Sequence, residues 1–301
     1  KRAFAKASDQ ERMSVAGRLA RAGKQGTRAL LDLAENTQDR KARARAFTAL
    51  EESVKDPNNQ DEEILGKLEK MAVQTDRQTD RQTALHASMA LMSFKKNLRA
   101  KVALKKAIQT QQGELDRAQL LGTFLVNIDK DKTEIPFFKE YFLNDKSEYV
   151  RIAAAGHLGS LGDKSGLAFC KTILEKEPID INVQRLQMYA ARAAGSIGDT
   201  NLLPILKTVA ASRKYGVAQS RAIMAINDIE LQSKQSKSQK LEYLKKSLGD
   251  PYSVRWAALT LANMKDKDAT AVLYWAAQQK DLAGAKIGTA PNYFVWAAWV
   301  N

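Results

Sequence analysis

The stretch Asn144-Asp145-Lys-Ser-Glu-Tyr-Val-Arg-Ile-Ala-Ala-Ala-Gly-His-Leu-Gly-Ser-Leu-Gly162-Asp163 decides how this chain folds. Apolar residues recur in it every three to four positions, which places them on one side of an α-helix. These residues are Val150, Ala154, Leu158 and Leu161. Gly162 is positioned to end that helix in a left-handed conformation, and Asp163 to cap a second helix near residues 166–174. The stretch therefore predicts two amphipathic helices joined by Gly-Asp.

The same design is repeated along the chain. A second copy starts at Leu186, reaches Gly198-Asp199, and places Pro204 in the first turn of its second helix, where a missing amide is harmless. A third copy runs from Gly249 to Trp275. Fainter copies extend the array to eight units of about 34 residues each, a period typical of helical hairpins. We expect these units at 8–36, 37–74, 75–112, 113–144, 145–178, 179–214, 215–249 and 250–281, so that the repeat array spans 1–281, and a loop with an apolar capping or partner-docking segment at 282–301.

The segments Val150–Asp163 and Val254–Ala258 resemble the short HEAT-like repeat, of the kind also found in phycobilin lyases. The resemblance covers residues 145–210 and 249–275 most closely. It implies an all-α fold: a right-handed α–α superhelix of about eight helical hairpins, whose inner helices line a concave, protein-binding surface. Most members of this family have no catalytic activity of their own. Strands do not compete with this interpretation, because alternation of apolar and polar residues is absent.

Composition excludes several classes of protein. With 301 residues, 44% hydrophobic and 27% charged, the chain has the composition of a folded protein and not of a disordered one. One cysteine, Cys170, cannot form an intrachain disulfide, and two histidines leave few ligands for zinc or iron-sulfur clusters, so we expect no cofactor. No window is apolar enough for a transmembrane helix. The chain starts at Lys1, so an exported protein without its signal and a cytoplasmic protein both stay open.

Positive charge suggests an acidic partner. The formal net charge is +14, with a densest basic stretch between Arg81 and Gly113 that contains no acidic residue. The candidate partner-binding bases in it are Arg81, Lys95, Lys96, Arg99, Lys101, Lys105 and Lys106. The alternative interpretation is a solvated helix face, since lysines commonly cover exposed helix surface around apolar rows.

Aromatic residues gather near the C-terminus. All four tryptophans lie after residue 255, and the candidate partner-binding aromatics are Trp256, Trp275, Tyr293, Phe294, Trp296 and Trp299. Exposed aromatics beside arginine anchor proteins and stack on nucleic acid bases alike. A terminal repeat that needs bulky side chains to close its core is an equally good explanation.

An aspartate precedes an arginine by five or six residues in the matched units, as in Asp145 with Arg151 and Asp250 with Arg255. The aspartate can accept amide hydrogen bonds at a helix start, while the arginine reaches an aspartate of the neighbouring repeat. We interpret these residues as a structural ladder and not as a binding site. His86, His157 and Cys170 are predicted to be packed side chains, because no nucleophile arrangement surrounds them.

These features favour a non-catalytic scaffold that binds a protein partner, with an acidic partner fitting the charge, as a subunit of a larger assembly. The alternative is a nucleic-acid-binding protein resembling the HEAT-like alkylpurine DNA glycosylases, although the catalytic residues of that family cannot be mapped onto this chain. A phycobilin lyase is a third hypothesis and rests on repeat type alone.

Overall fold

A computed structural model of the chain describes residues 4, 6–73, 78–95, 97–129 and 131–279. These residues contain α-helices and short 3-10 helices and no β-strand. The chain divides into two compact units, residues 1–154 and 155–301, with the boundary inside helix α10. Each unit is described by itself below.

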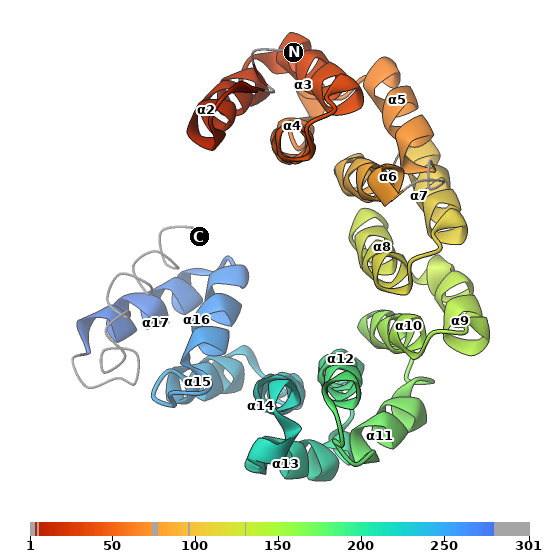
Figure 1. Cartoon of the computed structure of the whole chain (residues 1–301). Helices are drawn as coiled ribbons and strands as arrows, with labels where there is room; N and C mark the ends of the chain where they lie inside the picture. Colours follow the sequence, from red (N-terminus) through yellow and green to blue (C-terminus); the bar gives the residue numbers. More distant parts are fainter. Residues whose placement is uncertain (1–3, 5, 74–77, 96, 130, 280–301) are drawn as a thin grey trace. The chain divides into compact units, whose positions relative to one another are not determined.

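In the first unit, helices two positions apart in the chain pack on each other. Helices α2, α4, α6 and α8 contact one another in series, and so do α3, α5 and α7 (Figure 1). The unit is therefore built of two layers of helices. Its helices are α2 (Asp9–Ala20), α3 (Gly23–Asn36), α4 (Arg40–Ser53), α5 (Glu62–Ala72), α6 (Gln78–Leu91), α7 (Leu98–Thr110), α8 (Glu114–Asn127) and α9 (Ile135–Asn144), followed by α10 (Glu148–Ser160) at the boundary, with 3-10 helices η1 (Pro57–Asn59) and η2 (Lys132–Glu134).

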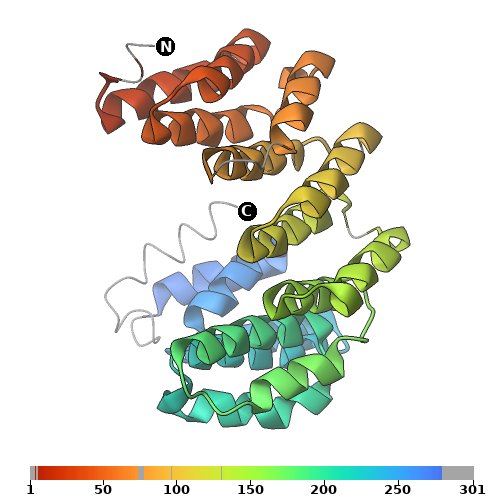
Figure 2. The same ribbon diagram turned by 45° about the vertical axis from the view of Figure 1, so that its right-hand side comes forward.

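The second unit repeats this arrangement. Helix α12 packs on α14 and α11 on α13, and these helices lie stacked in two layers in Figure 2. Helices α15, α16 and α17 pack on one another at the end of the described chain. The helices are α11 (Leu167–Glu175), α12 (Ile181–Ile197), α13 (Leu203–Ala211), α14 (Val217–Gln232), α15 (Lys237–Ser247), α16 (Val254–Asn263) and α17 (Lys267–Gln278), with 3-10 helices η3 (Thr200–Leu202) and η4 (Arg213–Tyr215).

The stretch that decides the fold behaves as its pattern predicts. The four apolar residues of its stripe are each at most 2% exposed. Gly162 has φ of +88°, a left-handed conformation that glycine adopts without steric cost, two residues after the end of α10. Asp163 then accepts the amide hydrogen bond of Ser165 at 2.9 Å. The predicted helix and glycine stop are confirmed. The predicted cap is wrong in its position, because Ser165 lies in the turn before α11, and the N-cap of α11 is Gly166, which makes no side-chain hydrogen bond.

Small residues let neighbouring helices approach closely. A Cβ atom at Gly159 of α10 would lie 2.7 Å from the Cα of Ile197 in α12, and one at Gly195 of α12 would lie 3.2 Å from the Cα of Ala225 in α14. Neither contact leaves room for a larger side chain without movement of the backbone. The alanine-rich composition of these helices therefore reflects their packing distance.

The expected all-α fold is confirmed, with helices packing in series as in an α–α solenoid. The described residues contain sixteen α-helices, α2–α17, which do not form exactly eight regular hairpins. The boundaries of the eight repeat units stay a prediction. The segment 282–301 lies outside the described residues.

Candidate functional site

Ion pairs between successive repeats run along both units. In each, a lysine or arginine binds an aspartate 28 to 35 residues further along the chain, about one repeat length. We call these contacts rung pairs and their acids rung aspartates. The four pairs with a contact shorter than 3 Å to a helix-start aspartate are Arg28 with Asp61 (2.8 Å), Arg117 with Asp145 (2.8 Å), Lys164 with Asp199 (2.9 Å) and Lys237 with Asp266 (2.7 Å).

Each rung aspartate also accepts a backbone amide at or just before the start of a helical segment. The donors are the amides of Ile64, Ser147, Asn201 and Asp268, at 2.9 to 3.0 Å. One carboxylate therefore accepts a helix-start amide that has no partner within its own helix, and it also neutralises a cation of the preceding repeat.

The pKa of every rung aspartate lies below its ordinary value. The amide of Asn201 contributes most to the lowering in Asp199, and the hydrogen bond from Lys237 contributes most in Asp266. In Asp61 and Asp145, burial alone would raise the pKa, but the amide and arginine hydrogen bonds outweigh it. All four side chains are therefore held in the charged form.

Asp145 and Asp250 each accept a backbone amide two residues on, at or before a helix start, and Asp145 also binds a cation of the preceding repeat. Asp145 binds Arg117 of α8 with two hydrogen bonds of 2.8 and 2.9 Å, while Arg151 donates from Nε to the carbonyl of Phe142 at 3.0 Å. Asp250 accepts the amide of Tyr252 at 3.4 Å, and Arg255 is exposed. Sequence reasoning missed Arg117 and the other rung cations. Their signal is the repeat spacing, a basic residue about 30 positions before a capping aspartate.

The basic stretch is largely built into the first unit. Arg81 lies in α6, Lys95 is exposed in the loop before α7, and Lys96 lies outside the described residues. The other four bases, Arg99, Lys101, Lys105 and Lys106, lie on α7. Only Lys106 of these four is exposed without an ion pair among the side chains that the structure describes.

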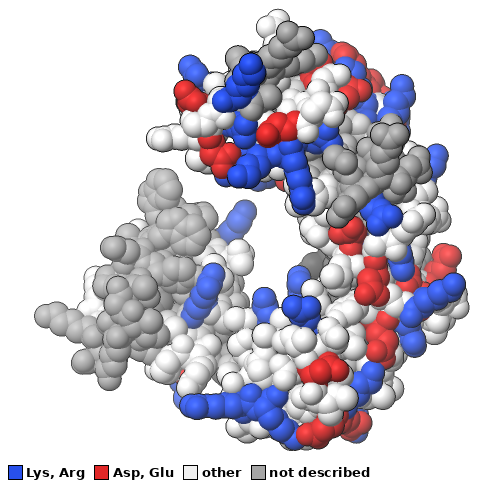
Figure 3. Space-filling view, in the orientation of Figure 1, with Lys and Arg blue, Asp and Glu red and all other residues white. Residues whose placement is uncertain are grey.

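Acidic residues of neighbouring helical segments pair with the other three bases on α7. Arg99 binds Glu62 and Glu69 of α5, each at 2.6 Å, and these carboxylates raise the pKa of Arg99, with Glu69 contributing most. On the face shown in Figure 3, lysine and arginine side chains are accordingly interspersed with acidic ones.

Glu134 is a buried acid shared by two lysines of the stretch. Burial alone would raise the pKa of Glu134, but hydrogen bonds from Lys101 and Lys105 hold it below its ordinary value. The ammonium of Lys105 also lies 5.0 Å from the ring centroid of Phe137, a cation–π distance. Because Arg99, Lys101 and Lys105 are paired, the basic stretch offers less free positive charge than its composition suggests.

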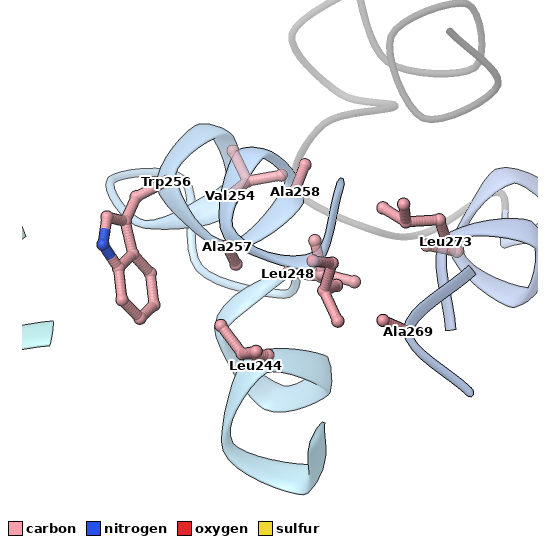
Figure 4. Close-up of a cluster of buried hydrophobic side chains, with 10 residues drawn as sticks. Leu244, Leu248, Val254, Trp256, Ala257, Ala258, Ala269 and Leu273 are labelled. Carbon is pink, nitrogen blue, oxygen red and sulfur yellow. The ribbon is translucent and has the colours of Figure 1, made fainter. Parts of the chain in front are cut away.

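The described tryptophans belong to the packing of the last helices. Trp256 is 8% exposed in a cluster formed by α15, α16 and α17, and its indole lies on the side of α16 opposite Leu273 (Figure 4). Trp275 is half-buried, with the ammonium of Lys245 lying 4.1 Å from its ring centroid. The predicted aromatic residues Tyr293, Phe294, Trp296 and Trp299 lie outside the described residues.

Trp256 connects this cluster to α14. Its Nε1 donates to Oδ1 of Asp228 at 2.7 Å, and burial raises the pKa of Asp228 although this hydrogen bond opposes the shift. Beside it, the hydroxyl of Tyr243 lies 3.1 Å from Oδ1 of Asn227 and 3.0 Å from Oε2 of Glu230, and these two acceptors share its single proton. Asn227 in turn donates to Ser253 at 2.8 Å. These polar groups satisfy one another across three helices, which is what a structural junction requires.

The histidines and the cysteine are packed as predicted. His86 stacks on Phe47 with ring centroids 5.3 Å apart, and its Nδ1 lies 3.1 Å from Oε1 of Glu51. Burial, with a smaller effect of Arg192, lowers the pKa of His157 to about 4. Burial raises the pKa of Cys170 to about 12, so its thiol stays protonated at neutral pH.

No group of three or more histidine, cysteine, aspartate or glutamate side chains placed to hold a metal ion was found in the described part of the chain. None of the described helices is both long and apolar enough to span a membrane.

Comparison with known proteins identifies the repeat type. A family model of HEAT repeats matches residues 135–227, from α9 into α14. No curated protein and no solved structure matches the chain. HEAT repeats generally act as protein-interaction scaffolds and are typically non-catalytic. This match, on an all-helical chain whose helices pack in series, fits a HEAT-like repeat protein.

Proposed function

We propose that this chain is a non-catalytic scaffold that binds a protein partner, as a subunit of a larger assembly. The observation that carries the proposal is the match to HEAT repeats over 135–227. A stacked array presents a long preformed surface, so a partner binds it with little loss of conformational entropy. The net charge of +14 would speed the capture of an acidic partner.

The use of the polar side chains supports the same proposal. The rung aspartates and the junction around Trp256 hold repeats together, and the described histidines and cysteine are packed without a nucleophile arrangement. The bases and aromatics that suggested nucleic acid binding are partly engaged in the same way, since Arg99 is ion-paired and Trp256 is buried. The protein-binding proposal therefore has more support than the nucleic-acid alternative.

The test is affinity capture of the tagged full chain from its native cells after mild chemical cross-linking, with and without nuclease treatment. A protein that is captured in stoichiometric amount and survives nuclease supports the proposal. Failure to recover any stoichiometric protein contradicts it, and so does a partner that is lost on nuclease treatment.

Titration of duplex DNA against the purified chain tests the alternative, with Arg255→Gln as the variant, because Arg255 is exposed beside Trp256. A scaffold predicts weak binding that disappears between about 50 and 200 mM salt and is the same in the variant. Micromolar binding that persists at the higher salt and falls in Arg255→Gln would favour a nucleic-acid function instead.

A further inference from the structure

A small polar pocket lies between α4 and α6 of the first unit. Helix α4 contributes residues at positions i, i+3, i+4 and i+7, and α6 contributes residues of one facing turn. The lining residues are Arg40, Arg43, Ala44, Phe47, Gln82, Thr83 and His86. The buried ring of Phe47 and the imidazole of His86 stacked on it form one part of the lining, and Arg40 and Arg43 contribute to the rest.

The two arginines of the pocket bind neutral acceptors only, among the side chains that the structure describes. Arg40 donates from Nε to the amide oxygen of Gln82 at 2.9 Å. Arg43 donates to the carbonyl of Thr37 at 2.7 and 2.9 Å and to the hydroxyl of Thr83 at 3.4 Å. Neutral acceptors orient a guanidinium without cancelling its charge, and each group keeps further N–H donors.

Other arginines of the same unit bind carboxylates instead. Examples are Arg28 with Asp61, Arg99 with Glu69 and Arg117 with Asp145. Arg40 and Arg43 differ from them in that they line a pocket and, among the described side chains, donate to neutral acceptors and not to a carboxylate. Two oriented guanidiniums next to a hydroxyl and an imidazole form a site for an oxyanion.

Nearby acids decide which oxyanion fits. Asp39 accepts the amide of Ala42 and lies 3.4 Å from Arg12, and Glu51 lies 3.1 Å from His86, so one negative charge stands at the wall of the pocket. The two guanidiniums and Glu51 together carry a net charge of about +1. One bound carboxylate would bring the net charge of the pocket to zero, whereas a phosphate dianion would make it negative. The charges therefore favour a monovalent anion.

We propose that the α4–α6 pocket binds the carboxylate of an acidic side chain in a peptide segment of the partner, through Arg40 and Arg43. This proposal rests on the proposed protein-binding function and assigns one contact point to it. The planar carboxylate matches the fork of N–H donors on a guanidinium, which is why arginine recognises it with two parallel hydrogen bonds.

The test measures the affinity of a fluorescein-labelled peptide of eight glutamates for the full chain by fluorescence anisotropy, with a peptide of eight glutamines as the neutral control. Arg40→Gln removes a pocket guanidinium from an exposed position, and Lys41→Gln removes the same charge from the next residue, which does not line the pocket. We expect Arg40→Gln to weaken binding about tenfold, as for a lost hydrogen bond between charged groups, and Lys41→Gln to change it less than about twofold. Equal losses in both variants, or no preference of the wild type for glutamate, would overturn the proposal.

Two further measurements identify the site and the anion. A photoreactive group on the peptide should cross-link to α4 or α6, and labelling of other helices alone would overturn the assignment. Inorganic phosphate should displace the peptide no better than acetate at equal ionic strength, and stronger displacement by phosphate would overturn the choice of a carboxylate. Arg43→Lys provides a second pocket variant, and thermal unfolding of each variant shows that it is folded.

Failure of this proposal can be told apart from failure of the proposed function. If only the pocket assignment is wrong, the wild type and Arg40→Gln capture the same protein partner from native cells in equal amounts. If the function is wrong, the wild type captures no protein partner, whatever the peptide assay shows.

Discussion

Arg117 and Asp145 form the most buried rung pair, and breaking it should destabilise the first unit. Their side chains are 16% and 9% exposed and share two hydrogen bonds of 2.8 and 2.9 Å. Removal of one partner from a fully buried ion pair costs about 3–5 kcal/mol, and an exposed pair contributes about 0–1 kcal/mol. The small remaining exposure places Arg117→Met between these limits, at about 2–4 kcal/mol of unfolding free energy. Methionine keeps the aliphatic packing of the arginine stem, so the loss reports the ion pair together with the hydrogen bond of 2.8 Å from Arg117 to the carbonyl of Gln111.

The matched control is Lys237→Met in the second unit. Lys237 contacts Asp266 at 2.7 Å, but the two side chains are 50% and 31% exposed, so solvent screens the pair. We expect no measurable loss of stability from this substitution. Lys237 also contacts Asp268 at 2.6 Å, so it has two acidic partners, and the comparison asks whether burial of the pair matters more than the number of its contacts.

Urea unfolding followed by circular dichroism measures the stability of each variant, and hydrogen exchange in α8 shows whether the loss is local to the Arg117 rung. The double variant Arg117→Met/Asp145→Asn leaves no unpaired charge. Its loss of unfolding free energy should therefore be smaller than the summed losses of the two single variants by at least about 1 kcal/mol. A loss below about 1 kcal/mol in Arg117→Met, or an equal loss in Lys237→Met, would refute the argument that burial makes this rung stabilising.

Three other predictions follow from the packing and the charges. Gly159→Ala should cost about 1–3 kcal/mol in thermal or urea unfolding, because its Cβ would overlap Ile197, whereas Gly17→Ala, with no atom within 4 Å of the added Cβ, should be neutral or stabilising. Asp228→Asn should leave the stability at neutral pH unchanged or higher, since it keeps an acceptor for Trp256 and removes a buried charge. Trp256→Phe leaves Asp228 without its donor and should cost about 1–3 kcal/mol of unfolding free energy. A Trp256→Phe variant more stable than Asp228→Asn would contradict this account of the junction. The rung aspartates have lower pKa values in the folded chain, so the unfolded chain binds more protons as the pH falls. Their contribution to stability is complete above the unfolded pKa of about 3.9 and is lost as the pH falls through the folded values. Urea midpoints that do not decrease below pH 4 would exclude this contribution.

Local sequence determined the helices of this protein and the points where they end. The apolar stripe of α10, the left-handed glycine at 162 and the proline in the first turn of α13 are all readable from neighbouring residues, and all three are confirmed. Helical periodicity and end signals act within a few residues, so sequence alone is sufficient for them. The repeat period likewise predicted that the helices pack in series.

Tertiary structure decided which charges meet and which stay free. Asp145 was recognisable as a helix-start residue, but only the structure shows that Arg117 is the cation that binds it, because the choice depends on how one hairpin is rotated on the next. The acid-free stretch around Arg99 becomes neutralised by acids from another helix for the same reason.

The pocket and the last tryptophans follow the same rule. Nothing local distinguishes Arg40 and Arg43 from the paired arginines of the first unit, and nothing local shows that Trp256 is buried on Asp228. The pocket and the burial of Trp256 both depend on side chains that come together from separate helices. These side chains are far apart in the sequence, where periodicity does not predict individual contacts. The sequence therefore determined the repeating helices and where they end, whereas the side chains left available to a partner were decided by the packing of one helix on another.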